Sequence, residues 1–204
     1  MTFLTIKNKG KLYYIYKDSE YIGFLYKNDF EKAGIDFSAV QNEGMTEVDD
    51  DSLQKIKDLV IYKAYDKAVS YLSDSEKCSD SIKLKLRMKS YPDYAIDEAV
   101  NLLYEYNYLN DERFAESYIR TYMYQKSRSL LRRELDMRHI RIDDLESLMD
   151  RVYSEEDMNE DKAIERLLKR FDGQDMTDER SRKRAAGLLV RHGFSFEQIN
   201  NHLT

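Results

Sequence analysis

One spacing of apolar residues occurs three times in this 204-residue chain and limits the folds open to it. Leu86, Leu135 and Leu189 each stand five positions before a large apolar residue, written Φ here. Further apolar residues follow after five and then four more positions, giving L-x4-Φ-x4-[IL]-x3-Φ without a gap in any copy. A repeated pattern of this length is typical of proteins built from tandem structural units.

An alanine precedes each copy and marks an earlier helix. Ala68, Ala115 and Ala163 are each followed four residues later by an aliphatic residue, which places both side chains on one helical face. The five-residue step from Leu to Φ then predicts a chain that leaves one helix and turns into the next. Glycine and proline, seven and one residues respectively, are too scarce to interrupt many helices. We predict a mainly α protein of three tandem three-helix repeats in an elongated curved array.

The first residues follow a different pattern. Lys11–Lys17 and Tyr21–Tyr26 are rich in aromatic and β-branched residues around a three-residue loop, which predicts a β-hairpin, with Phe3–Lys7 as a third strand. A short helix over Asp29–Ala33 and a polar, acidic linker over Gln41–Asp51 follow. A helix capped by Asp51 or Ser52 then begins the repeats. The predicted domains are an N-terminal β-rich extension with its linker at 1–50, and repeats at 51–109, 110–156 and 157–204.

Several functional classes lack their residues in this sequence. The single cysteine, Cys78, provides neither a disulfide framework nor a cysteine-rich metal site. The three histidines lack carboxylate or cysteine neighbours at ligand spacing, and no glycine-rich phosphate loop or nucleophile motif is present. We therefore expect no catalytic site, metal or cofactor. No apolar run is long enough to span a membrane, so we expect a cytoplasmic monomer that makes no membrane contact.

Positive charge is concentrated in the middle repeat, although the whole chain has a net charge of −6. Between positions 120 and 141 there are two acids, Glu134 and Asp136, and seven basic residues: Arg120, Lys126, Arg128, Arg132, Arg133, Arg138 and Arg141. Two interpretations are open. The cations form a contact surface for an acidic protein face or a phosphate backbone, or they are a solvated face tied by helical ion pairs such as Glu134–Arg138. Because two acids cannot pair with seven cations, we favour a partner-binding surface.

Two smaller basic clusters are secondary candidates for partner binding. They lie in the first repeat at Lys83, Lys85 and Arg87, and in the third repeat at Arg182, Lys183 and Arg184. Asp111 and Glu112 also suggest an acid–base pair, but they follow Asn110, a good helix N-cap. We interpret them as first-turn acids that the helix dipole favours.

Several runs resemble the RecX family, bacterial regulators of the RecA recombinase. The run YLNDERFA at 108–115 and the downstream Arg132–Leu135 are similar to the family's middle repeat. The run RHGFSFEQI at 191–199 looks like its closing motif, and AYDKAVSYL at 64–72 resembles its first repeat. Asn107 stands where the family usually has glycine, a small change because asparagine also adopts left-handed backbone geometry.

The resemblance implies a specific function. A RecX-like protein would bind the groove of the RecA–DNA filament and bridge neighbouring protomers. It would mostly inhibit filament growth, ATP hydrolysis and strand exchange, and thereby regulate recombination, DNA repair and the SOS response. Its partner would be the RecA filament, with weak contact to single- or double-stranded DNA possible. Two alternatives stay open: an autonomous helical DNA-binding protein that uses the basic face of the second repeat, and an adaptor for an unrelated protein.

Overall fold

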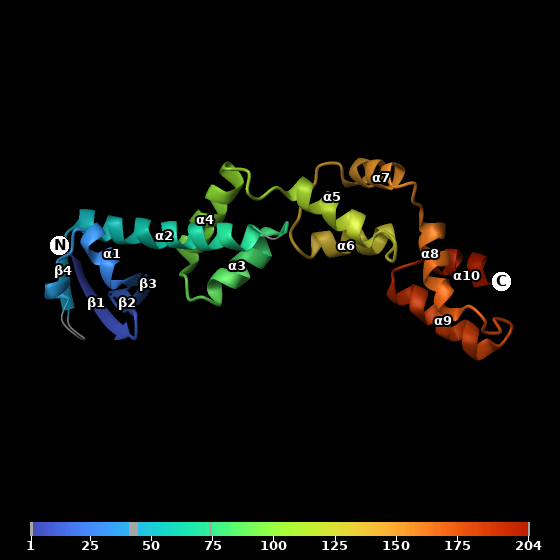
Figure 1. Cartoon of the computed structure of the whole chain (residues 1–204), viewed down its shortest axis with the longest axis horizontal. Helices are drawn as coiled ribbons and strands as arrows, with labels where there is room; N and C mark the ends of the chain where they lie inside the picture. The colour runs from blue at the N-terminus through green and yellow to red at the C-terminus, as the bar shows by residue number, and fades with distance from the viewer. Residues whose placement is uncertain (1, 41–44, 74, 204) are drawn as a thin grey trace. The chain divides into compact units, whose positions relative to one another are not determined.

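The computed structural model describes residues 2–40, 45–73 and 75–203. The chain forms two compact bodies: an N-terminal body, Met1–Leu109, and a C-terminal body, Asn110–Thr204. It is mainly helical with one small antiparallel sheet in the N-terminal body, as the sequence predicted (Figure 1).

The sheet has four strands in the order β3-β2-β1-β4, each antiparallel to its neighbour. Alternation along the strands points Leu4, Ile6 and Ile15 to one face, where they are buried. Asp18 and Ser19 both have positive φ, so the loop between β2 and β3 is a tight two-residue turn and Glu20 already belongs to β3. The strands are β1 (Thr2–Lys9), β2 (Leu12–Lys17), β3 (Glu20–Tyr26) and β4 (Met45–Val48).

The strand β4 corrects the prediction of a linker over residues 41–51. Residues 45–48 pair with β1, and Thr46 and Val48 are buried. Alternation in the run MTEV is a weak signal, because the exposed Met45 is apolar and the buried Thr46 is polar. Positions 41–44 of the predicted linker lie outside the described residues.

One long helix, α2 (Asp50–Leu72), packs on the inner face of the sheet. Its N-cap is Asp49, whose carboxylate accepts the Ser52 amide at 2.7 Å, and not Asp51 or Ser52 as predicted. The helix lies close against Gly23 of β3, where an added Cβ would be 2.7 Å from Val60. A short helix, α1 (Lys27–Lys32), adds a buried ion pair between Asp29 and Lys63 at 2.8 Å.

The remaining helices follow in threes. The first helical unit comprises the end of α2, α3 (Ser79–Arg87) and α4 (Asp93–Glu105). The second comprises α5 (Asp111–Tyr122), α6 (Arg128–Asp136) and α7 (Leu145–Glu155). The third comprises α8 (Glu160–Leu168), α9 (Glu179–Arg191) and α10 (Phe196–Leu203), with a 3-10 turn, η2 (Lys169–Phe171), after α8. The predicted anchors Ala68, Ala115, Ala163, Leu86, Leu135 and Leu189 are all at most 1% exposed.

The middle helix of every unit ends in the same hydrogen-bonded corner. Ser90, His139 and Gly193 adopt left-handed φ values of 64°, 56° and 87°. The amide of the next residue donates to the carbonyl of the anchor leucine five positions earlier, at 3.2, 3.1 and 3.2 Å respectively. This is a Schellman motif, in which a left-handed residue lets two amides satisfy the last helical carbonyls. The L-x4-Φ spacing in the sequence is therefore the signature of this corner.

The second and third helical units are joined through the corner at Gly193. The Ser127 amide donates to the His192 carbonyl at 2.9 Å, and the Ser127 hydroxyl donates to the Gly193 carbonyl at 2.7 Å. The fit is close: a Cβ on Gly193 would lie 2.5 Å from the Leu130 Cβ. Glycine is required here both for its positive φ and for the space.

We predict that Gly193→Ala lowers the free energy of unfolding by about 2 kcal/mol or more, because it adds steric overlap to an unfavourable φ. The measurement is urea denaturation followed by circular dichroism at 222 nm. Gly173→Ala is the matched control, since Gly173 also has a positive φ of 80° but no atom within 4 Å of an added Cβ. Equal losses in the two variants would show that backbone conformation alone matters and that the contact with Leu130 does not.

Candidate functional site

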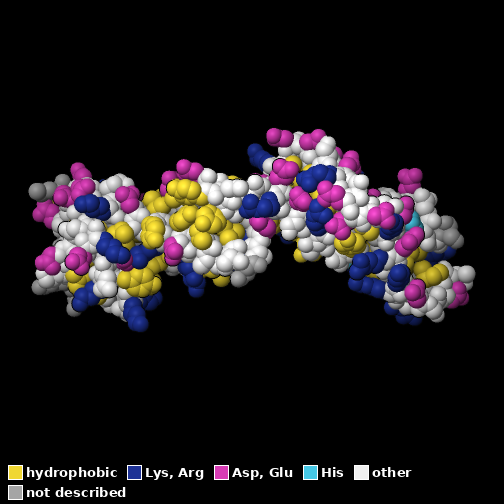
Figure 2. Space-filling view, turned by 45° about the horizontal axis from the view of Figure 1, so that its top comes forward, with side chains coloured by type: hydrophobic (Ala, Val, Ile, Leu, Met, Phe, Trp, Pro, Cys, Tyr) yellow, Lys and Arg dark blue, Asp and Glu magenta, His cyan; other side chains and the backbone are white. Residues whose placement is uncertain are grey.

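The seven predicted cations lie on α5, α6 and the segments that follow these helices. Between positions 120 and 141 the sequence has only two acidic residues. The structure brings four more acids to the same surface from α7 and its C-cap: Glu146, Asp150, Glu155 and Glu156. Figure 2 shows acidic and basic side chains interleaved over this part of the C-terminal body.

Arg120 is held by three carboxylates. It donates to Glu116 one turn earlier on α5 at 2.9 Å, and to Glu156 at 2.6 Å, and it also pairs with Glu155. The hydrogen bond from Arg120 holds the pKa of the Glu116 carboxyl below its usual range. Arg120 therefore ties α5 to the end of α7 and is already occupied by internal partners.

Lys126 forms the most buried pair of this surface. Its ammonium donates to both oxygens of Glu134, at 2.9 and 2.7 Å, and lies 4.1 Å from the centroid of the Tyr122 ring. The hydroxyl of Tyr118 donates to the same carboxylate at 2.6 Å. Arg138 donates to the backbone carbonyl of Glu134 at 2.7 Å, so the predicted Glu134–Arg138 contact is a hydrogen bond to the main chain. These groups fasten α5 to α6.

Arg128 and Arg132 lie along α6 and face α7. Arg128 pairs with Asp150 at 2.6 Å and with Glu146 at 3.2 Å, while Arg132 pairs with Glu146. Arg132 nevertheless keeps 55% of its side chain exposed. Five of the seven cations thus have internal partners. A count of acids between positions 120 and 141 could not reveal all of these pairs, because several of the acidic partners lie outside that range.

Arg133 and Arg141 are the remaining two, and both are exposed. Neither forms an ion pair with any residue that the structure describes. They border a hollow of about 550 Å³ between α6 and the α6–α7 loop. Arg132 and two acids, Asp136 and Asp143, also line it, together with an apolar floor that includes Ile140. We call this the basic hollow.

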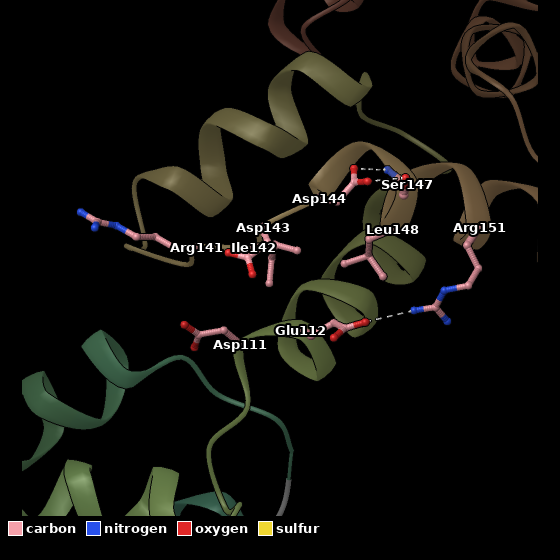
Figure 3. Close-up of a pocket in the computed structure, with 9 residues that line it drawn as sticks. All are labelled: Asp111, Glu112, Arg141, Ile142, Asp143, Asp144, Ser147, Leu148 and Arg151. Atoms are coloured by element: carbon pink, nitrogen blue, oxygen red, sulfur yellow. Dashed lines mark hydrogen bonds and ion pairs between the residues drawn. The ribbon is translucent and has the colours of Figure 1, made fainter.

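A second hollow, of about 510 Å³, lies on the other side of the same loop (Figure 3). Its walls carry four acids, Asp111 and Glu112 at the start of α5 and Asp143 and Asp144 at the start of α7. The sequence placed the first two in a helical first turn, and both lie there after the N-cap Asn110. We call this the acidic hollow.

The acids of this hollow are partly engaged. Asp144 caps α7 by accepting both the amide and the hydroxyl of Ser147, which hold the pKa of its carboxyl below the usual range. Glu112 lies 3.6 Å from Arg151 on α7. The side chain of Arg141 points away from these acids, although its loop lines both hollows (Figure 3).

The two hollows place positive and negative charge side by side on one region of the surface, which we call the charged corner and which is distinct from the hydrogen-bonded corners of the helices. Such a surface is complementary to a protein face that also carries both signs. A phosphate backbone is uniformly negative and would be repelled by the acidic hollow. The charged corner is therefore better suited to a protein partner than to nucleic acid.

The two secondary clusters differ in the contacts that their cations make. In the first unit Lys83 pairs with Asp97 at 2.7 Å and Arg87 with Asp93 at 2.8 Å, while Lys85 lies over the Tyr71 ring. These cations serve contacts within their own unit.

In the third unit Lys183 pairs with Glu179, and Arg182 and Arg184 line separate pockets. Arg184 shares its pocket, of about 370 Å³, with Arg170 and Arg191. The last two were not predicted from the sequence. A spacing of seven residues between Arg184 and Arg191, which is two helical turns, was the available signal.

Other classes of site find no support in the described part of the chain. It contains no group of three or more His, Cys, Asp or Glu side chains placed to hold a metal ion. Among the same residues no helix is long and apolar enough to cross a membrane.

Comparisons with known proteins identify the second unit most directly. A family model described as RecX, second three-helix domain, matches residues 110–147, which hold α5, α6 and the start of α7. The regulatory protein RecX of Bacillus velezensis is 33% identical over 143 residues, which are 69% of this chain and 54% of that protein. The chain thus spans about half the length of that relative. RecX of Vibrio parahaemolyticus is 28% identical over 139 residues and is covered over 87% of its length.

Solved structures agree on the fold. A crystal structure of a regulatory protein RecX is similar with a TM-score of 0.55 and 20% identity, and the similarity covers 98% of both chains. The crystal structure of RecX from Lactobacillus salivarius has a TM-score of 0.51 and 24% identity, covering 71% of this chain and 94% of that one.

We predict that Glu134→Gln lowers the free energy of unfolding by about 1–3 kcal/mol at pH 7, because it leaves the Lys126 ammonium without a charged partner. Burial raises the pKa of the Glu134 carboxyl, but Lys126 and Tyr118 outweigh burial and hold it below the usual range. A carboxyl whose pKa is lower in the folded state stabilises the fold at pH values above its unfolded pKa of about 4.3. This stabilisation is lost as the pH falls through the folded pKa.

The difference between wild type and Glu134→Gln should therefore be constant near neutral pH and shrink in acid. Urea denaturation at pH 7, 5 and 3 measures it. Glu165→Gln is a control on the exposed side of α8. A difference that stays the same down to pH 3 would mean that the Glu134 charge does not stabilise this cluster.

Proposed function

Because this chain belongs to the RecX family, we propose that it is a non-enzymatic regulator of a RecA recombinase. In this proposal it binds the RecA–DNA filament in the cytoplasm and restrains filament growth, ATP hydrolysis and strand exchange. The contact is made by the second helical unit, at the charged corner that carries the basic and acidic hollows.

One observation carries the proposal: the free cations of the second unit lie next to an acidic hollow. Arg133 and Arg141 have no ion pair within the described residues, whereas Asp111, Glu112, Asp143 and Asp144 stand across the same loop. Free charges at the rim of an interface steer association and fix its register. The charged corner also coincides with the residues that match the family model.

The alternative of an autonomous DNA-binding protein rests on a different observation. The pocket around Arg184 has three arginines and a lysine and no acid among its lining residues. If this pocket made the main contact, binding to naked DNA would weaken steeply with salt. An adaptor for an unrelated protein would instead bind without any dependence on RecA.

Hydrolysis of ATP by the cognate RecA on single-stranded DNA tests the proposal. We expect inhibition when this protein is present well below one copy per RecA protomer, because a regulator that caps or bridges protomers acts on more than one of them. Unchanged hydrolysis at equimolar folded protein would contradict it. Tight binding to DNA alone, with no effect on RecA, would favour the DNA-binding alternative.

We predict that Arg133→Ala combined with Arg141→Ala raises the half-inhibitory concentration by about fivefold or more, which corresponds to about 1 kcal/mol of binding free energy. Arg132→Ala with Arg133→Ala should act in the same direction, since the Arg132 side chain is largely exposed. Helical circular dichroism should not change in either variant.

The matched control removes two positive charges elsewhere, by Lys32→Ala with Lys57→Ala on α1 and α2. This variant should inhibit as the wild type does. If the control loses as much activity as the Arg133 and Arg141 pair, overall charge and not the charged corner determines the effect.

A further inference from the structure

The outer face of the N-terminal sheet carries aromatic rings on its two central strands. Tyr13 and Ile15 point inward, and Tyr13 packs edge-on against Phe30. The alternate residues Tyr14 and Tyr16 therefore point outward. Along β1 the register places Thr5 opposite Tyr16 and Lys7 opposite Tyr14, on the same outer face. Phe3 lies on this face too and is 53% exposed.

These rings are held in place from one side. Tyr16 and Tyr14 contact the ring of Tyr21 on β3, with centroids 5.5 and 6.0 Å apart. The hydroxyl of Tyr21 donates to the carbonyl of Ser90 at 2.7 Å, which fixes that edge of the sheet to the first helical unit. The rings toward β1 remain half-buried or exposed. The face is thus a supported row of aromatic groups with one side open.

Two lysines lie on the same face as the row. The first 17 residues contain four lysines and no acid, although the whole chain has a net charge of −6. Lys7 and Lys9 lie on the outer face by register and are exposed, and the Lys7 ammonium is 5.0 Å from the centroid of the Tyr16 ring. Among the strand residues that the structure describes, Glu47 on β4 is the acid that register places on this face, opposite Phe3.

We propose that this face is a binding site for single-stranded nucleic acid, with bases stacked on the rings of Phe3, Tyr14 and Tyr16 and the phosphates held by Lys7 and Lys9. Residues two apart on a strand stand about 6.6 Å apart, so Tyr14 and Tyr16 offer successive stacking positions. Rings flanked by lysines are the combination that binds single strands without sequence preference. The cation–π contact places the Lys7 ammonium over the Tyr16 ring. A base that stacks on this ring takes the place of the ammonium, which then pairs with a phosphate of the strand.

Duplex nucleic acid does not suit the site, because its bases are paired and unavailable for stacking on the rings. An acidic protein would use the lysines but would gain nothing particular from a row of rings. The combination therefore favours a single strand. DNA and RNA share the phosphates and bases that these residues recognise.

The first test is fluorescence anisotropy of labelled oligonucleotides of 15 deoxythymidines or 15 uridines, titrated with the full chain at low salt. Lys7→Gln with Lys9→Gln, and separately Tyr14→Val with Tyr16→Val, should each weaken binding by at least about fivefold. The controls are Lys32→Gln with Lys57→Gln, and Tyr62→Val, which removes a ring that is 64% exposed on α2. Equal affinity of all variants, or no binding of either oligonucleotide, would overturn the proposal.

The second test locates the strand. Oligonucleotides that contain 5-iodouracil form a bond to a stacked aromatic ring under near-ultraviolet light, and mass spectrometry identifies the peptide. We expect crosslinks within residues 3–16. Crosslinks confined to residues 110–204 would assign binding to the C-terminal body and refute the site. A dimer of the free protein that Tyr16→Val dissociates, without crosslinks in the sheet, would assign the face to a second copy of the chain.

The RecA assay depends on Arg133 and Arg141, whereas these tests depend on residues of the N-terminal sheet. Each proposal can therefore fail without the other. A preference between the two oligonucleotides would distinguish DNA from RNA as the bound strand.

Discussion

The helical part of this protein depends on a hydrogen bond that closes the end of each middle helix, from the amide of Tyr91, Ile140 or Phe194 to the carbonyl of the anchor leucine five residues before. Helix ends leave carbonyls without partners, and a buried helix end is costly unless they are satisfied. The left-handed residue in between makes the turn. The same corner then places the large apolar side chain that follows over the core of its unit. The same turn therefore satisfies the carbonyls at the helix end and positions an apolar side chain in the core of the unit.

The charged surface shows what a sequence pattern can and cannot predict. The helices, the anchors and the corners follow from spacing, because the interactions that form them are within a few residues of each other. Pairing of Arg120 with Glu156 or of Arg128 with Asp150 joins residues that are 36 and 22 positions apart. A count of acids within a window cannot detect such pairs. The sequence therefore located the cationic helix but could not separate Arg133 and Arg141 from the cations that hold α5, α6 and α7 together.

The N-terminal sheet was predictable to a different degree. Its first three strands have strong aromatic and β-branched patterns, and they were found within a few residues of their ends. The fourth strand, Met45–Val48, has four residues and two polar side chains, and its pairing with β1 is a long-range contact. Alternation alone also could not tell which rings would be covered. Tyr21 and Tyr14 look equivalent in sequence, yet the Tyr21 hydroxyl donates to the Ser90 carbonyl, while the Tyr14 ring contacts neighbouring rings of the sheet.

The boundaries between the helical units also bear on how a chain of this kind can change its length over time. Each later unit starts at an asparagine cap, Asn110 or Asn159, and the helix before it stops at a left-handed residue, Asn107 or Asp157. Start and stop signals thus lie within a few residues of each boundary. A gene duplication with its ends near these two positions would insert a complete unit that needs no compensating substitutions to begin or end its helices. With such boundaries, evolution can change the number of units more easily than it can change the length of a helix inside one unit.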